Sequence, residues 1–137
     1  MNPQKYKNLR APGVVTTPFG GRTRGEAVHP AVDFANKSGT PIPAFADGVI
    51  AKVGKRNDGF GNVVIMKDKG GNVHQYGHLQ NALVKPGTVV KKGQTIARMG
   101  KSGHSYSPTG GDPSHLDLRI ATAAGKWKNP LTYINKI

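Results

Sequence analysis

The chain of 137 residues contains no cysteine. Disulfide bonds and thiolate metal sites are therefore excluded, and a metal ion would have to bind through imidazole or carboxylate groups. Long apolar runs are also missing, because no stretch approaches the roughly 18 apolar residues of a membrane span. The opening MNPQKYKNLR lacks the apolar segment of a signal peptide, so we expect no export by that route if Met1 is the native start.

Acidic residues are scarce, with 7 Asp and Glu against 20 Lys and Arg, and the formal net charge is +13. Such a balance favours a polyanionic partner, which can be nucleic acid, an acidic membrane or an anionic cell-wall polymer. The basic residues are scattered and form only short pairs such as Lys91–Lys92 and Lys55–Arg56. No basic stripe is interleaved with aromatic residues as in single-strand binders, so we expect no specific nucleic-acid partner.

Sustained helical periodicity is absent, whereas 19 Gly and 10 Pro indicate many turns between short strands. The pattern predicts an all-β, antiparallel single domain, a sheet or β-sandwich with long loops that form a substrate groove. We expect residues 1–15 to form an extended arm and residues 16–137 the domain. Strands are predicted at 29–35, 48–54, 62–68, 72–79 and 114–121, with two more around a turn within 86–100. Loops 57–61 and 101–113 would wall the groove, and the tail 127–137 would hold a short helical turn.

The stretch SHLDLRI, residues 114–120, places an imidazole and a carboxylate two positions apart. Side chains alternate between the faces of a strand, so His115 and Asp117 share one face. Leu116 and Leu118 share the other face and can fill a core. The polar face therefore needs a role of its own.

Five histidines are present, and three predicted strands each deliver an imidazole or carboxylate near an end. His29 precedes Asp33, His78 ends a second strand, and His115 lies beside Asp117 on a third. Imidazole and carboxylate bind zinc when no thiol is available, and a catalytic zinc needs three protein ligands and nearby acid–base groups. His74 is predicted on the same face as His78, in a supporting role, and His104 in a loop facing substrate or solvent.

The motifs HPAVDFA, QYGHL and SHLDLRI, in that order, resemble the three signature motifs of the lysostaphin-type zinc metalloendopeptidases, which are peptidoglycan hydrolases. The resemblance extends through TPFGGR, GFGNVVIMKD and NPLTYI, and covers roughly residues 16 to 134. It implies the family's fold, with one bound zinc ion.

Carried over residue by residue, the resemblance implies that His29 and Asp33 are zinc ligands. It implies that His78 and His115 are catalytic. The family has a second histidine, its third zinc ligand, where this chain has Asp117. A carboxylate oxygen can coordinate zinc, so we expect Asp117 to be the third ligand, and oxygen ligands make the site more hospitable to Mn²⁺.

The implied function is a zinc metalloendopeptidase that hydrolyses peptide bonds in the stem or cross-bridge of bacterial peptidoglycan. We expect a monomer whose basic surface holds anionic cell-wall polymers. It would act on the wall, in the periplasm or outside the cell. A phage lysis enzyme (an endolysin), present in the host cytoplasm before lysis, or a virion-associated enzyme fits this description, as does a catalytic fragment of an exported protein.

Three alternatives remain at this point. The chain can be a degenerate, non-catalytic wall-binding or regulatory module of the same fold. The segment VKPGTVVKKGQTIARMG resembles half of a lipoyl-type carrier domain with a modified hairpin lysine, although a turn pattern alone is weak evidence. Nucleic-acid binding rests on charge alone, and a steep salt dependence on DNA without zinc would support it.

Overall fold

A computed structural model describes residues 14–17, 31–56, 59–103 and 114–130, and the structural statements below concern these residues. They contain ten β-strands. The strands are Val14–Thr17 (β1), Val32–Ala35 (β2), Pro41–Pro43 (β3), Gly48–Arg56 (β4), Gly61–Asp68 (β5), Val73–Ala82 (β6), Val89–Val90 (β7), Thr95–Met99 (β8), His115–Ala121 (β9) and Trp127–Lys128 (β10).

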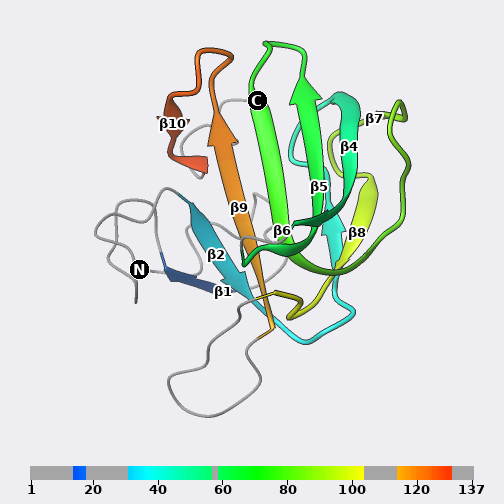
Figure 1. Ribbon diagram of the computed structural model, residues 1–137, viewed down its shortest axis with the longest axis vertical. Coiled ribbons are helices and arrows are strands. Elements are labelled where there is room, and N and C mark those ends of the chain that lie inside the picture. Colours follow the sequence, from blue (N-terminus) through cyan, green and yellow to red (C-terminus); the bar gives the residue numbers. More distant parts are fainter. Residues whose placement is uncertain (1–13, 18–30, 57–58, 104–113, 131–137) are drawn as a thin grey trace.

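All strand pairs are antiparallel, and the main path through the sheet is β1-β2-β9-β6-β5-β4-β7. Strand β10 pairs with β9, and β8 pairs with both β6 and β3. Strands β9, β6 and β5 therefore run through the middle of the domain (Figure 1). The all-β, antiparallel single domain predicted from the sequence is confirmed.

The short strands depart from the sequence-based expectations. Strand β3 contains two prolines and pairs only with β8 among the described strands. It is therefore an edge strand, where the missing N–H groups of proline are tolerated. Trp127 and Lys128 form a short strand that pairs with β9. The helical turn expected in the tail stays a prediction, because residues 131–137 lie outside the described part of the chain. The predicted boundary at residues 15 and 16 stays a prediction, because residues 1–13 also lie outside it. Among the described residues, no helix has the length and apolar character needed to cross a membrane.

The core lies on one face of the central strands and contains a row of three aromatic rings. Phe45 lies between Phe34 and Tyr76, with ring centroids 6.0 Å and 6.1 Å away respectively. Leu116 and Leu118 of β9 are also fully buried there, as strand alternation predicts. Burial of these side chains supplies the main stabilising free energy of the fold.

Changing Tyr76 to phenylalanine tests the one polar group in this aromatic row. The Tyr76 hydroxyl accepts a hydrogen bond from the Phe45 N–H at 3.0 Å, and both residues are buried. Without the hydroxyl this N–H loses a buried partner, so we expect Tyr76→Phe to lower the free energy of unfolding by about 1–3 kcal/mol. Urea denaturation measures the change, and an unaltered midpoint would contradict it.

A β-bulge in β6 reverses the direction of its side chains. Both Gly77 and His78 lie opposite the single residue Val63, between the pairs Tyr76–Val64 and Leu79–Asn62. His78 has a φ of 61°, which is uncommon for a residue other than glycine. Tyr76 and Leu79 consequently both reach the core, and His78 points to the opposite face.

The bulge makes one sequence-based expectation wrong. His74 was predicted to share a face with His78, because four positions separate them in a regular strand. In the structure His74 is fully buried on the core face, where its register partners Met66 and Ile120 are also buried. The extra residue changes the alternation between the two histidines, so His74 does not support the site on the other face.

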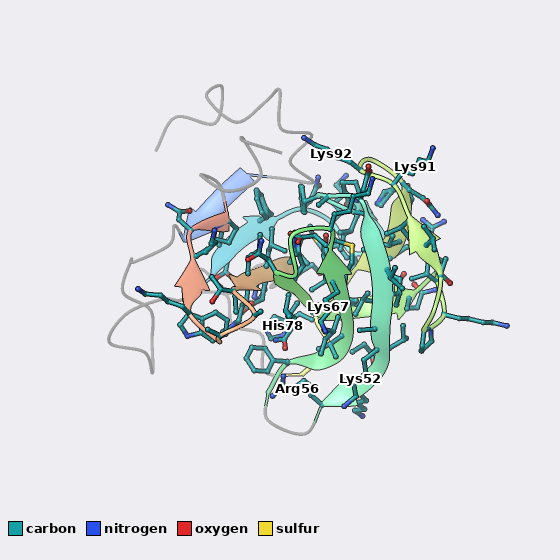
Figure 2. All side chains as sticks on the ribbon, turned by 90° about the horizontal axis from the view of Figure 1, so that it is seen from above. Lys52, Arg56, Lys67, His78, Lys91 and Lys92 are labelled. Carbon is teal, nitrogen blue, oxygen red and sulfur yellow. The ribbon has the colours of Figure 1, made fainter. Side chains whose placement is uncertain are left out.

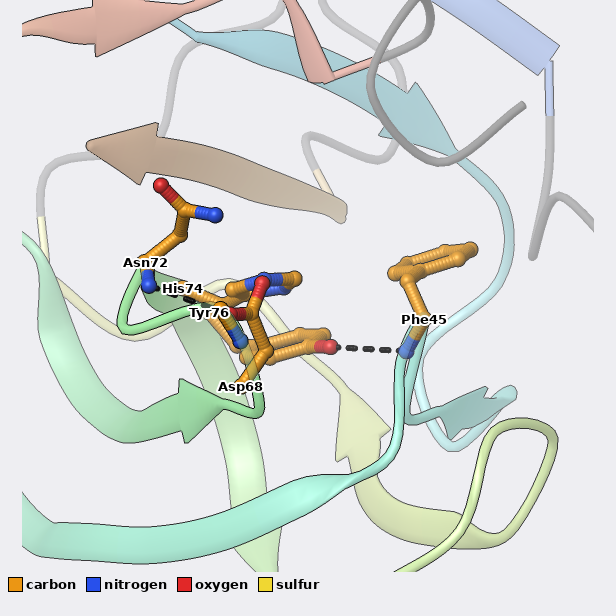
Figure 3. A network of polar contacts seen from close by, with 6 residues as sticks. Phe45, Asp68, Asn72, His74 and Tyr76 are labelled. Atoms are coloured by element: carbon orange, nitrogen blue, oxygen red, sulfur yellow. Dashed lines mark hydrogen bonds and ion pairs between the residues drawn. The ribbon is translucent and has the colours of Figure 1, made fainter. Parts of the chain in front are cut away.

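His74 instead stabilises the hairpin between β5 and β6 (Figure 3). Its Nε2 lies 2.8 Å from Asp68 Oδ2, and the other oxygen of Asp68 accepts hydrogen bonds from the N–H groups of Gly70 and Asn72. Burial lowers the pKa of His74, although the hydrogen bond and charge of Asp68 oppose this shift. The imidazole is therefore neutral in the folded protein near pH 7.

The lowered pKa of His74 predicts acid-sensitive stability. Below its ordinary pKa of about 6.5 the unfolded chain binds a proton that the folded protein excludes. Stability is therefore complete above that value and decreases as the pH falls through it. We expect urea denaturation at pH 7, 6 and 5 to show this decrease, with a shallower dependence in His74→Gln. Identical slopes in both proteins would contradict the assignment.

Candidate active site

Two carboxylates face each other on the side of the sheet opposite the core. Asp33 of β2 and Asp117 of β9 are direct partners in the antiparallel register. On the other side of β9, Gly77 of β6 is the register partner of Asp117. Gly77 has no side chain to project from this face. Side chains of such directly opposed residues have Cβ atoms about 4.5–5.5 Å apart, so the two carboxylates share one small region.

Burial makes this pair of like charges unfavourable without a cation. Asp117 is only 4% exposed, and the Oδ1 atom of Asp33 is buried. Directly opposed like charges destabilise a sheet, and buried charges need compensation. Two converging carboxylates are also suitable ligands for a divalent metal ion. The donor chemistry of this region therefore fits a metal such as zinc or manganese.

Arg119 supplies one compensating charge, and the sequence reasoning did not find it. Its Nε donates to Asp117 Oδ1 at 2.9 Å and its Nη2 donates to Oδ2 at 3.0 Å. The guanidinium thus takes both oxygens of Asp117 in a bidentate ion pair. The alternation that pairs His115 with Asp117 places Arg119 on the same face, so this signal was present in SHLDLRI.

Phe60 holds the guanidinium of Arg119 in place. The Arg119 Cζ atom lies 4.5 Å from the centroid of the Phe60 ring, and the Arg56 Cζ atom lies 5.1 Å from it. Arg56 also donates a 2.7 Å hydrogen bond to Gln75, the register partner of Arg119. These contacts fix one arginine against Asp117 and the other beside the ring.

Two histidines meet on the same face of the sheet. The rings of His78 and His115 have centroids 4.5 Å apart and are tilted by 44°. The bulge in β6 brings His78 to this face, and the first residue of β9 is His115, two positions before Asp117. The predicted catalytic histidines are therefore in contact, and they adjoin the carboxylate pair.

The Ser102 carbonyl determines which nitrogen of His78 carries a proton. This carbonyl lies 2.8 Å from His78 Nδ1, and a carbonyl oxygen only accepts, so Nδ1–H is the donor. In the neutral ring, Nε2 then has the lone pair that can accept a proton. Burial is the largest cause that lowers the pKa of His78, and the hydrogen bond to Ser102 and the charge of Asp117 oppose this shift only in part.

Two glycines allow Ser102 to approach His78. Gly61 and Gly103 have φ values of +65° and +77°, and a Cβ on either would lie 2.4 Å from backbone atoms of the neighbouring segment. Because neither residue has a side chain, the segment after β8 packs directly on the start of β5. Ser102 is secured there by donating from its hydroxyl to the Leu79 carbonyl at 2.6 Å.

The remaining predicted site residues are only partly covered. His29, which was predicted as a metal ligand, lies outside the described residues, as does the loop residue His104. Within the described part of the chain, no group of three His, Cys, Asp or Glu side chains converges to hold a metal ion. Asp33 and Asp117 are brought together, and the ligand set of His29, Asp33 and Asp117 stays a prediction.

Comparisons with known proteins match most of the chain. A family model described as peptidase family M23 matches residues 27–130. An uncharacterized metalloprotease of Haemophilus influenzae is 39% identical over 117 residues, which are 84% of this chain and 22% of that protein. The peptidoglycan DD-endopeptidase ShyC of Vibrio cholerae is 40% identical over 104 residues, or 76% of this chain and 22% of ShyC.

A third relative is named as an activator of other enzymes. The murein hydrolase activator NlpD of Escherichia coli is 34% identical over 122 residues, which are 89% of this chain and 29% of NlpD. The chain thus spans about a quarter of the length of these three curated relatives.

Solved structures with the same fold include the catalytic domain of the antimicrobial peptidase lysostaphin from Staphylococcus simulans. It aligns with a TM-score of 0.78 and 27% identity over 98% of both chains. A zinc containing peptidase from Vibrio cholerae aligns with a TM-score of 0.74 and 26% identity, over 87% of this chain and 36% of that one.

Proposed function

The chain belongs to peptidase family M23, the lysostaphin-type family, and on this basis we propose that it is a zinc metalloendopeptidase that hydrolyses peptide bonds of bacterial peptidoglycan. The observation that carries the proposal is the contact between His78 and His115 on the face that holds Asp33 and Asp117. A structural role alone does not require two histidines and two carboxylates on one small region.

His29, Asp33 and Asp117 would hold the zinc ion, with Mn²⁺ as a possible substitute because two of the three ligands offer oxygen. A zinc ion polarises a scissile carbonyl and lowers the pKa of a water molecule near it. Asp117 would have to share its carboxylate with Arg119, or release that side chain, for this role.

The two histidines would divide the acid–base work. His78 is held by Ser102 with its Nε2 lone pair available, which suits acceptance of a proton from the attacking water. His115 is partly exposed and lies beside it, so it can stabilise developing negative charge or protonate the leaving amine. Exchanged roles are equally compatible with the contact between the rings.

A second candidate function is a non-catalytic module that regulates or binds wall hydrolases. The bidentate ion pair between Arg119 and Asp117 favours it, because it occupies the residue expected as a ligand. The relative NlpD, named as a murein hydrolase activator, supports the same alternative. Such a module would need the fold and the surface, and it would need neither metal nor hydrolysis.

One experiment separates the two functions. Purified protein is analysed for metal and then incubated with peptidoglycan, whose fragments are identified by mass spectrometry. The enzyme is expected to bind about one zinc per chain and to release new peptide termini, which also identify the bond that is cut. Full metal loading without new termini, or neither result, would favour the non-catalytic module.

The basic surface is proposed to bind anionic cell-wall polymers. Lys52 and Lys67 are exposed on β4 and β5, and Figure 2 shows them on the same side of the domain as Arg56 and His78. The net charge of +13 would hold the enzyme on a polyanionic wall while the site acts. A monomer suffices for this role, and sedimentation tests that expectation.

Wall capture predicts a salt effect that depends on the substrate. Activity on intact walls should fall as salt rises past about 0.15 M, where the screening length is about 8 Å. Cleavage of a small neutral peptide should fall much less, because it requires no long-range attraction. Equal salt sensitivity on both substrates would argue against electrostatic capture.

Proteins of this family act at the cell wall, and we propose the same place of action here. A phage-lysis or virion-associated role, with a stage in the host cytoplasm, stays a prediction from the sequence alone.

A further inference from the structure

We propose that Arg119 is a built-in cationic competitor for Asp117, which lowers the affinity of the site for a metal ion. This inference rests on the proposed metal site and concerns a residue that the proposed hydrolysis does not otherwise use. The observation that carries it is the bidentate bond, with Nε to Oδ1 at 2.9 Å and Nη2 to Oδ2 at 3.0 Å.

The bidentate geometry distinguishes competition from support. A side chain that merely orients a metal ligand usually bonds one atom and leaves another for the metal. Arg119 bonds both oxygens of Asp117, so about two of the four lone pairs of this carboxylate are taken and its negative charge is already paired. A metal ion between Asp117 and Asp33 must therefore either displace the guanidinium or share the carboxylate with it, and both outcomes weaken metal binding.

The surroundings of Arg119 make the exchange costly. Its side chain is 11% exposed and that of Asp117 is 5% exposed, so water does little to weaken their attraction. The Phe60 ring adds a contact at 4.5 Å to the Arg119 Cζ atom. A displaced guanidinium would also stay close to a divalent cation, and this like charge would weaken metal binding further.

The consequence is a site whose metal affinity is set by an arginine. The ion pair stabilises the free protein and a bound metal ion weakens or breaks it, so the lost stabilisation is subtracted from the affinity. Removing the guanidinium raises the energy of the free state more than that of the metal-bound state, because only in the free state is Asp117 left buried without a cation. The substitution should consequently tighten metal binding while it destabilises the metal-free protein.

The test measures zinc affinity by competition with a chromophoric chelator, without reference to hydrolysis. Arg119→Gln is expected to bind zinc about tenfold or more tightly than the unaltered protein, a factor that corresponds to about 1.4 kcal/mol. Arg119→Lys keeps the positive charge but cannot form the bidentate bond to Asp117. Its increase in zinc affinity should therefore be smaller. In a protein that already carries Asp117→Asn, adding Arg119→Gln should not increase the zinc affinity.

Arg56→Gln is the matched control, because Arg56 contacts the same Phe60 ring and donates its 2.7 Å hydrogen bond to Gln75. Its zinc affinity should change by less than about threefold if general charge is a minor effect. Circular dichroism checks that each variant is folded, and Arg119→Lys serves as the test if Arg119→Gln is not.

Three results overturn or support the inference separately from the proposed function. Tight zinc binding by the unaltered protein with no gain in either Arg119 variant overturns competition and leaves the enzyme proposal standing. Zinc binding that emerges only in the Arg119 variants supports competition and favours the non-catalytic module for the natural chain. The lack of zinc binding in every variant overturns both.

Discussion

Replacing His78 with alanine should reduce hydrolysis of peptidoglycan by about 10²–10⁴-fold, the usual contribution of a general acid or base. The Ser102 carbonyl holds His78 Nδ1 at 2.8 Å and so directs the other nitrogen to its task, a function that alanine cannot supply. Zinc content should be unchanged, because His78 is not among the expected ligands. His115→Ala should have a loss of the same order, since its ring is in contact with that of His78.

The strand itself provides a matched control for this experiment. His74 lies four residues before His78 in β6 and is buried on the opposite face, beside Asp68. His74→Gln should therefore keep its hydrolytic rate at temperatures where the variant is folded, although its stability falls. Near-normal turnover of His78→Ala on wall fragments would remove His78 from the mechanism. An equal loss in His74→Gln would indicate that the assay reports folding.

Replacing Asp33 with asparagine should abolish stoichiometric zinc while it stabilises the metal-free protein. The amide removes the negative charge of one expected ligand, and three protein ligands are the usual minimum for a catalytic zinc. The same change removes the repulsion between directly opposed Asp33 and Asp117, since like charges opposite each other destabilise a sheet. Opposite effects on metal content and on metal-free stability are expected for a metal ligand and not for a residue that only supports the fold.

Elemental analysis and urea denaturation of the metal-free protein measure the two effects. Asp47→Asn is the control, because Asp47 accepts a bond from the Lys92 N–H at 2.7 Å, far along the chain from the site strands. That variant should keep its zinc. Retention of full zinc by Asp33→Asn would show that Asp33 is not a ligand.

Strand alternation explains how much of the site was predictable. Leu116 and Leu118 fill the core while His115, Asp117 and Arg119 share the other face, and this follows from the order of residues in β9 alone. The same rule gives wrong results in β6, because local sequence does not reveal where a bulge interrupts the alternation. Tertiary contacts were equally invisible to sequence reasoning.

Ser102 illustrates this second limit. Its carbonyl reaches His78 only because Gly61 and Gly103 let two segments approach more closely than any side chain permits. Phe60 likewise becomes part of the site through the guanidinium groups that lie near its ring. Such partners come from segments distant in sequence, so the spacing of residues within a motif cannot predict them.

The bulge in β6 makes the direction of His78 depend on backbone geometry as well as on residue identity. Both Gly77 and His78 lie opposite Val63, and this doubling keeps His78 on the site face while Leu79 stays in the core. The same residues in a regular strand would turn the imidazole into the core and Leu79 outward. A chain that keeps every letter of QYGHL but pairs these residues without the bulge would therefore have lost its acid–base group, and an alignment of sequences would not reveal the loss.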